Sequence, residues 1–107
     1  MNQATMVYKQ EIIGKILVQL SLDGWNKDFP EECTIYIAPT NWSNTHNYIC
    51  LTLRKNLKGA IEFMQDSASM DNHNFRFTYA AWNQFSIYTQ MAYSILNSNK
   101  TYNDLGI

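Results

Sequence analysis

The stretch YICLTLR, residues 48–54, alternates apolar and polar side chains almost without a break. Ile49, Leu51 and Leu53 fall on one side of an extended backbone, and the residues between them fall on the other side. A period of two residues is typical of a strand that has one face in a core and one face open. The stretch therefore predicts a strand in a sheet that is covered on one face.

Three other segments alternate in the same way, before and after this stretch. They are CTIYIA at 33–38, AIEFM at 60–64 and FRFTY at 75–79. Their β-branched and aromatic residues favour strands. Because sequential strands joined by short loops usually pair with their neighbours, we expect a four-stranded antiparallel meander.

The segment KNLKG, residues 55–59, joins the second and third of these strands. We expect a hairpin turn here, because Gly59 can adopt the positive φ angle that tight turns need. The alternative is a short helix capped by Asn56, and a glycine in its first turn disfavours it. The choice decides whether residues 60–64 form a strand or part of a helix.

The N-terminal segment, residues 3–20, gives two conflicting periods. Four apolar residues have helical spacing and predict an amphipathic helix: Ile13, Ile16, Leu17 and Leu20. From residue 18 to residue 22, however, apolar and polar side chains alternate as in a strand. We expect the helix, ended by Gly24, because two turns of helical spacing outweigh three alternations. For residues 15–22 a strand is the alternative.

Residues 80–97 have a helical period without such a conflict. Their main stripe consists of Phe85, Thr89, Ala92 and Leu96, flanked by Trp82, Tyr88 and Ile95. Ile87, Met91 and Tyr93 lie outside this stripe, so the predicted helix is apolar over more than one face. Such a helix is either buried between layers or in contact with another chain, which makes it a candidate homodimer surface.

These elements predict one α+β domain over residues 1–107, with a four-stranded antiparallel sheet and an N-terminal and a C-terminal helix packed on one face. The face expected under the helices carries Cys33, Ile35, Ile37, Ile49, Leu51, Leu53, Ile61, Phe63, Phe75, Phe77 and Tyr79. The opposite face, expected to be open to water or to a partner, carries Tyr36, Tyr48, Cys50, Thr52, Arg54, Glu62, Met64, Arg76 and Thr78.

The composition narrows the classes of protein to consider. A chain of 107 residues can bury a core without disulfides or metals. Its net charge is −1, so no uniform field attracts nucleic acid or an anionic membrane. The first ten residues do not resemble a signal peptide and no long apolar run follows, so we expect a cytoplasmic protein without a membrane segment. In that compartment, Cys33 and Cys50 would be free thiols.

The residue spacing gives little support to catalysis or metal binding. His46 and Cys50 fall on the same strand face, but residues four apart on a strand are about 13 Å apart, too far for a base to activate a thiol. An enzyme built around Cys50 and a histidine stays open as an alternative. The residues that could bind zinc have no chelating spacing: Cys33, His46, Cys50 and His73. Glycine-rich phosphate loops are absent, so we expect no catalytic residue, metal or cofactor.

RNA binding is the other alternative, through a sheet face that carries Arg54 and Arg76. Lys55 and Lys58 add positive charge nearby. However, no Lys/Arg-Gly pair precedes the aromatics of residues 75–79, and these aromatics fit the core better. Because the net charge also opposes this function, we do not expect nucleic acid as the partner.

The stretch DGWNKDFPEE, residues 23–32, combines four acids with two large aromatics in a chain that is otherwise poor in charge. It is either a connection with solvated charges or a recognition segment. In the second case, aromatic side chains anchor a partner protein and the acids attract a basic one. Aromatics of the next loop and of the open face would extend this surface. The predicted partner-binding residues are Asp23, Trp25, Asp28, Phe29, Glu31, Glu32, Tyr36, Trp42 and Tyr48.

The order of the predicted elements is EIIGKILVQL as a helix, the acidic turn FPEEC, a meander that begins with TIYIA, and a C-terminal helix. This order resembles that of small bacterial immunity proteins, over most of the chain and without a diagnostic motif. The resemblance implies a non-enzymatic cytoplasmic inhibitor that binds a toxin domain, such as a nuclease. It implies no particular site residue.

Overall fold

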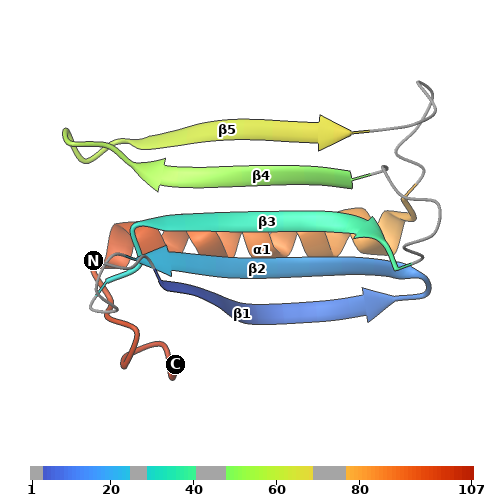
Figure 1. The fold of residues 1–107 in the computed structure, drawn as a ribbon, viewed down its shortest axis with the longest axis horizontal. Coiled ribbons are helices and arrows are strands. Elements are labelled where there is room, and N and C mark those ends of the chain that lie inside the picture. The colour runs from blue at the N-terminus through green and yellow to red at the C-terminus, as the bar shows by residue number, and fades with distance from the viewer. Residues whose placement is uncertain (1–3, 25–28, 41–47, 69–76) are drawn as a thin grey trace.

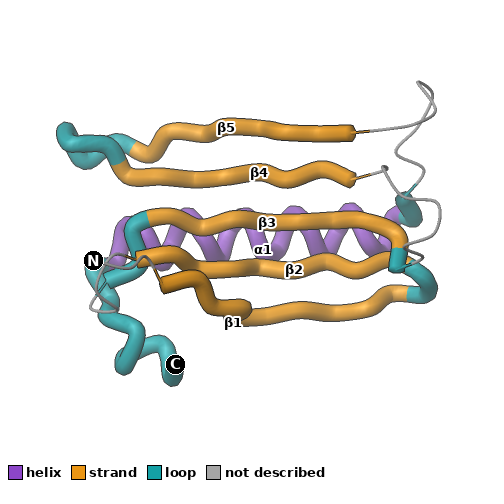
Figure 2. Tube along the Cα trace, viewed as in Figure 1, coloured by secondary structure: helices purple, strands orange, loops and turns teal. Residues whose placement is uncertain are grey.

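The computed structural model describes residues 4–24, 29–40, 48–68 and 77–107. These residues form one antiparallel sheet and one helix that lies on one face of the sheet (Figure 1, Figure 2). In chain order the elements are β1 (Ala4–Ile13), β2 (Ile16–Gly24), β3 (Glu32–Pro39), β4 (Tyr48–Lys55), β5 (Ile61–Ala68) and α1 (Tyr79–Ser98). The fold class is α+β as predicted, but with five strands and one helix instead of four strands and two helices.

The sheet is a meander in which each strand pairs with the next one along the chain. Its order is β1-β2-β3-β4-β5, and each of the four pairings is antiparallel. Three of the predicted strands are confirmed as β3, β4 and β5, and β5 continues to Ala68. The alternation of side chains therefore correctly predicted the strands β3, β4 and β5.

The predicted N-terminal helix is wrong, because residues 4–24 form the hairpin of β1 and β2. Gly14 has a φ angle of 64° and makes the tight turn between Ile13 and Ile16, which face each other across the hairpin. The strand-like alternation that competed with the helix is the one that the fold uses: Val18, Leu20 and Leu22 are buried. Segments rich in β-branched residues gain more from a half-buried sheet than from an amphipathic helix.

The C-terminal helix is confirmed, whereas the strand predicted at 75–79 is wrong in its described part. Thr78 is the N-cap of α1, with its hydroxyl accepting a hydrogen bond of 3.2 Å from the Ala81 N–H. Tyr79 begins the helix and is 86% exposed, so it does not join the core. Phe77 is buried and packs edge-on against Trp82. The helix cap at Thr78 therefore decides the structure of residues 77–79 against their alternating pattern. Phe75 and Arg76 lie outside the described residues.

The β4–β5 turn is a hairpin turn, as expected. Gly59 has a φ angle of 84°. Asn56 does not cap a helix but organises the turn, since its side-chain oxygen accepts hydrogen bonds from the N–H groups of Lys58 and Ala60 at 2.9 and 3.0 Å. An asparagine that bonds its own following backbone is a common turn device.

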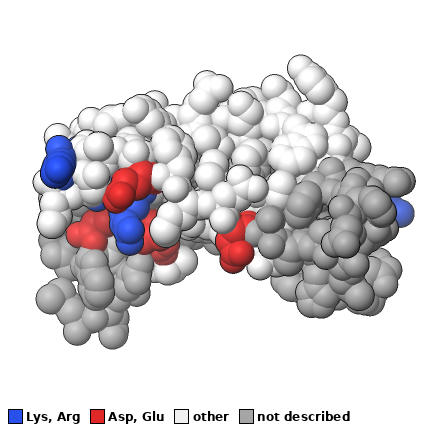
Figure 3. Space-filling model, turned by 90° about the horizontal axis from the view of Figure 1, so that it is seen from above, with Lys and Arg blue, Asp and Glu red and all other residues white. Residues whose placement is uncertain are grey.

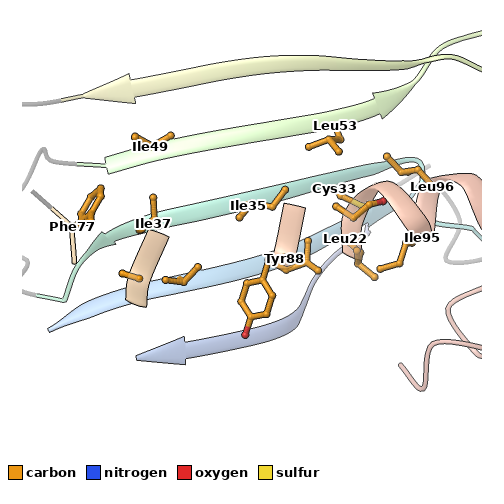
Figure 4. Close-up of a cluster of buried hydrophobic side chains, with 14 of the residues drawn as sticks. Leu22, Cys33, Ile35, Ile37, Ile49, Leu53, Phe77, Tyr88, Ile95 and Leu96 are labelled. Carbon is orange, nitrogen blue, oxygen red and sulfur yellow. The ribbon is translucent and has the colours of Figure 1, made fainter. Parts of the chain in front are cut away.

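The core lies between α1 and the middle of the sheet. Helix α1 packs on β2 and β3 and touches β4 less (Figure 1). Figure 4 shows side chains of this core between the sheet and the helix. Its largest fully buried side chains are Val18, Leu20, Leu22, Cys33, Ile35, Ile37 and Leu53. Leu51 and Ile61 are only partly buried, and Phe63, expected inward, is 55% exposed, because α1 packs mainly on β2 and β3.

The residues after α1 return to the end of the sheet through Tyr102, which is buried. Its ring lies over Gly24, the last residue of β2: a Cβ atom added at Gly24 would lie 2.8 Å from the Tyr102 hydroxyl oxygen and would also collide with the Phe29 carbonyl oxygen. Leu105 and Ile107 pack against the same core. The C-terminal segment therefore packs directly against the backbone of Gly24.

Candidate protein-binding face

The sheet face opposite α1 is not covered by any element of the described part of the chain (Figure 1). The strand registers show which residues share this open face, because residues paired across an antiparallel sheet point to the same side. One row across the sheet is Thr5, Asp23, Glu32, Arg54 and Glu62. A second row, farther along the strands, is Gln10, Gln19, Tyr36, Cys50 and Asp66.

The first row is the charged end of the open face. Asp23 pairs with Glu32, which pairs with Arg54. The Glu31 N–H donates a hydrogen bond of 2.7 Å to the Asp23 carbonyl oxygen, which holds the acidic segment against β2. Phe29, in the same segment, is 49% exposed. Of the predicted recognition segment, the structure therefore brings together Asp23, Glu31, Glu32 and Phe29, with Arg54 next to Glu32.

Tyr36 and Tyr48 form the aromatic part of the open face. Their ring centroids are 5.7 Å apart at an interplanar angle of 36°. Burial raises the pKa of Tyr36, and the neighbouring Tyr48 and Cys50 raise it further. Glu32, Thr34 and Tyr36 alternate along β3, so the charged end and the tyrosine pair are about 13 Å apart on one continuous face.

Three of the predicted partner-binding residues, Trp25, Asp28 and Trp42, lie outside the described residues. The other six are on the open face or beside its charged end: Asp23, Phe29, Glu31, Glu32, Tyr36 and Tyr48. The prediction did not include the apolar side chains that β1 adds to this face. Val7 and Ile12 are exposed there, opposite Ser21 and Leu17. The alternation over residues 18–22 was the signal that would have revealed them.

The two cysteines lie on opposite faces of the sheet and are both free thiols. Cys33 is buried under α1, and its thiol donates a long hydrogen bond of 3.9 Å to the Ala92 carbonyl oxygen. Cys50 is half-buried on the open face, where burial raises its pKa and Asp66 raises it further. A nucleophilic thiol needs a lowered pKa, so the surroundings of Cys50 give no support to the enzyme alternative; His46 and His73 lie outside the described residues.

Alkaline pH is expected to destabilise the fold through Cys33. Burial, with Asp23 and Glu32 nearby, raises the pKa of its thiol from 9.0 to about 12. Between these pH values the unfolded chain loses a proton that the folded chain keeps, so stability is full below about pH 9 and falls toward pH 12. Urea unfolding from about pH 8 to about pH 11 should show this fall.

The matched variant for this measurement is Cys33→Ala, which removes the titrating group. Its free energy of unfolding should fall less with pH than that of the wild type, whatever its value at neutral pH. A smaller slope should remain, because burial also raises the pKa of Tyr102, from 10.0 to about 12, and those of Tyr36, Cys50 and Tyr88. An equally steep fall in Cys33→Ala would contradict the assignment to Cys33.

The β4–β5 turn is the most basic part of the described chain. Arg54, Lys55 and Lys58 line a shallow hollow beside it, with Glu62 at its border. Leu57, in the same hollow, is fully exposed, and a neighbouring hollow is bordered by Glu31. The RNA alternative used Arg54 and Arg76, and Arg76 lies outside the described residues. Because acids border both hollows, this charge pattern does not favour an RNA phosphate backbone.

Within the described residues there is no cluster of three or more groups suited to a metal ion. The described helical residues also include no segment with the length and hydropathy to cross a membrane. Comparisons with family models, with curated proteins and with solved structures each found no match. Among the described residues, the open face is therefore the feature that points to a function.

Proposed function

We propose that this chain is a non-enzymatic inhibitor that binds another protein, a basic toxin or effector domain, in the cytoplasm. In this role it would act as an immunity protein. The supporting observation is that Asp23, Glu32, Tyr36 and Tyr48 share one sheet face with no described element over it. Open antiparallel faces with aromatics at their centre and charges at their rim are suited to protein recognition.

The two parts of the face have different roles in this proposal. The acids at the charged end attract a basic surface over a distance, which chiefly raises the rate of association. The tyrosine rings and Phe29 give rigid aromatic contact area, which chiefly slows dissociation. A basic nuclease domain is a partner of this kind, because its substrate groove is positively charged and acids can occupy it.

The acids are tested by neutralising Asp28, Glu31 and Glu32 with Asn, Gln and Gln. At low salt, the association rate with the partner should fall by about tenfold, and its dependence on salt should weaken. The partner is obtained by affinity capture from the native host, purified, and measured by surface plasmon resonance. Glu11→Gln is the matched control, because Glu11 is an exposed acid that lies off the open face. Association of the triple variant at the wild-type rate would refute steering by these acids.

The aromatics are tested with the double variant Tyr36→Ala/Tyr48→Ala. Dissociation of the same partner should be faster by about tenfold or more, with a much smaller change in association. Tyr79→Ala is the control, since Tyr79 is exposed at the start of α1 on the other side of the sheet. Thermal unfolding of each variant separates a binding defect from a loss of fold. If both variants bind like the wild type and the captured protein keeps its activity in the complex, the proposed function is wrong.

The outer surface of α1 keeps its place as a candidate homodimer surface. The helix contains no charged residue, and Ile87 and Tyr93 are exposed on it. Its buried residues, Ala81, Tyr88, Ala92, Ile95 and Leu96, form one stripe toward the sheet. The dimer through this helix stays a prediction.

A further inference from the structure

Strand β5 is an edge of the sheet that the described residues leave unpaired on its outer side. It pairs with β4 over eight successive residues without a shift in register. The other edge strand, β1, is interrupted by a bulge between Val7 and Lys9. A regular edge strand offers a row of free backbone N–H and C=O groups, whereas a bulge twists an edge away from pairing. Of the two edges, β5 is therefore the better template for another strand.

The two sides of β5 differ in chemistry. On the side of α1, Phe63 stacks on Tyr93 with ring centroids 6.4 Å apart, and the two residues are 55% and 47% exposed. On the open face, Glu62 and Asp66 flank the exposed Met64. Figure 3, which views the molecule from the β5 side, shows acidic side chains along this edge, with basic ones near the end that carries the β4–β5 turn. The edge is therefore apolar on one side and acidic on the other.

A second copy of this chain does not fit this edge well. In an antiparallel pairing of β5 with itself, residues that lie opposite each other must point to the same face. The two-fold axis that relates the two copies must therefore pass through a residue and not between two residues. With the axis at Met64, Glu62 of one copy would lie directly opposite Asp66 of the other copy. With the axis at Phe63 or Gln65, the acidic residues of the two copies would be diagonal neighbours. Each of these registers brings like charges together, and β5 has no cation to balance them.

We propose that the outer edge of β5 binds an extended segment of another protein, which adds as a sixth strand and carries cations on the open side. Its cations would lie opposite Glu62 and Asp66, and an apolar residue between them would lie opposite Met64. On the other side, an apolar residue would cover the Phe63–Tyr93 stack. The inference rests on the proposed function, since it proposes that a segment of the basic partner binds as a strand along the outer edge of β5.

The probe for this site is a blocked seven-residue peptide, acetyl-Thr-Lys-Thr-Val-Val-Lys-Thr-amide, which has lysines four residues apart. Its affinity is measured by microcalorimetry, and hydrogen exchange of the protein is measured with and without it. The outward amides of β5 should become protected from exchange. Glu62→Gln/Asp66→Asn should weaken binding by about tenfold. Glu62→Lys/Asp66→Lys should prefer the same peptide with glutamates in place of lysines. Glu11→Lys, on the β1 edge, should leave the affinity unchanged.

Backbone pairing is separated from simple charge attraction by two N-methylated forms of the peptide, one methylated at odd and one at even positions. Amides of a strand point alternately to the two sides, so one form should lose binding and the other should keep it. Equal binding of both forms would overturn the proposal. So would a concentration-dependent dimer that Phe63→Lys dissociates, because the occupant of the edge would then be a second copy.

The outcome also separates this inference from the proposed function. If the captured partner depends on the open-face acids and tyrosines but ignores the β5 variants, and the peptide does not bind, the function stands and the β5 site is wrong. If the peptide binds as described but no captured protein is inhibited, the β5 site stands and the inhibitor role is wrong.

Discussion

Replacing Ile35 by alanine is expected to lower the free energy of unfolding by about 2–5 kcal/mol. Ile35 is fully buried in β3, the central strand of the sheet, where it pairs with Leu20 on one side and Leu51 on the other. Helix α1 lies over this position, so the neighbours cannot collapse easily into the space that the side chain leaves (Figure 4). Urea unfolding followed by circular dichroism measures the change.

Ile12→Ala is the matched control for this experiment. It removes the same atoms from a strand position that is 63% exposed, so it should cost less than about 1 kcal/mol. A similar loss of stability in the two variants would mean that the core does not lie between β3 and α1.

Replacing Gly24 by alanine is expected to cost about 2–4 kcal/mol. The new methyl group would collide with the Phe29 carbonyl oxygen, which is backbone and cannot rotate away. It would also lie 2.8 Å from the Tyr102 hydroxyl oxygen and 2.9 Å from the Tyr102 ring, so the C-terminal segment would have to move away from Gly24. The measurement is urea unfolding, with hydrogen exchange of residues 101–107 to detect their release.

Gly14→Ala separates this close approach from the general cost of replacing a glycine. A Cβ atom at Gly14 has no neighbour within 4 Å, but the φ angle of 64° is unfavourable for alanine, so we expect a loss of about 1 kcal/mol. If Gly24→Ala cost no more than Gly14→Ala and left residues 101–107 protected, the contact with Tyr102 would have no energetic importance.

The sequence predicted β3, β4, β5 and α1, because their apolar residues recur at a clear period, but it wrongly extended the strand pattern to residues 77–79, where Thr78 caps α1. In β3 and β4 the alternation was unbroken, and Gly59 marked the turn before β5. The N-terminal hairpin was missed because apolar residues across the turn at Gly14 happen to have helical spacing. A period counted across a turn belongs to neither strand, and local spacing alone cannot reveal where the chain reverses.

The candidate face could be predicted only in part for the same reason. Tyr36, Tyr48 and Cys50 were placed on one face by alternation, and the registers confirm this. The contribution of β1 and the edge position of β5 depend on which strands are neighbours in space. In the expected meander a strand at 75–79 followed residues 60–64, so β5 was not expected at an edge, and β1 was expected to be part of a helix.

The order of the elements along the chain has a consequence for how the protein folds during synthesis. The strand pairings join neighbouring segments and can form as each hairpin leaves the ribosome, because they close short loops. The core closes only when α1 arrives, through contacts such as that between Cys33 and Ala92, which spans 59 residues. Until the helix docks, the sheet has one apolar face without a cover, so chaperone binding and self-aggregation compete with helix docking in that interval.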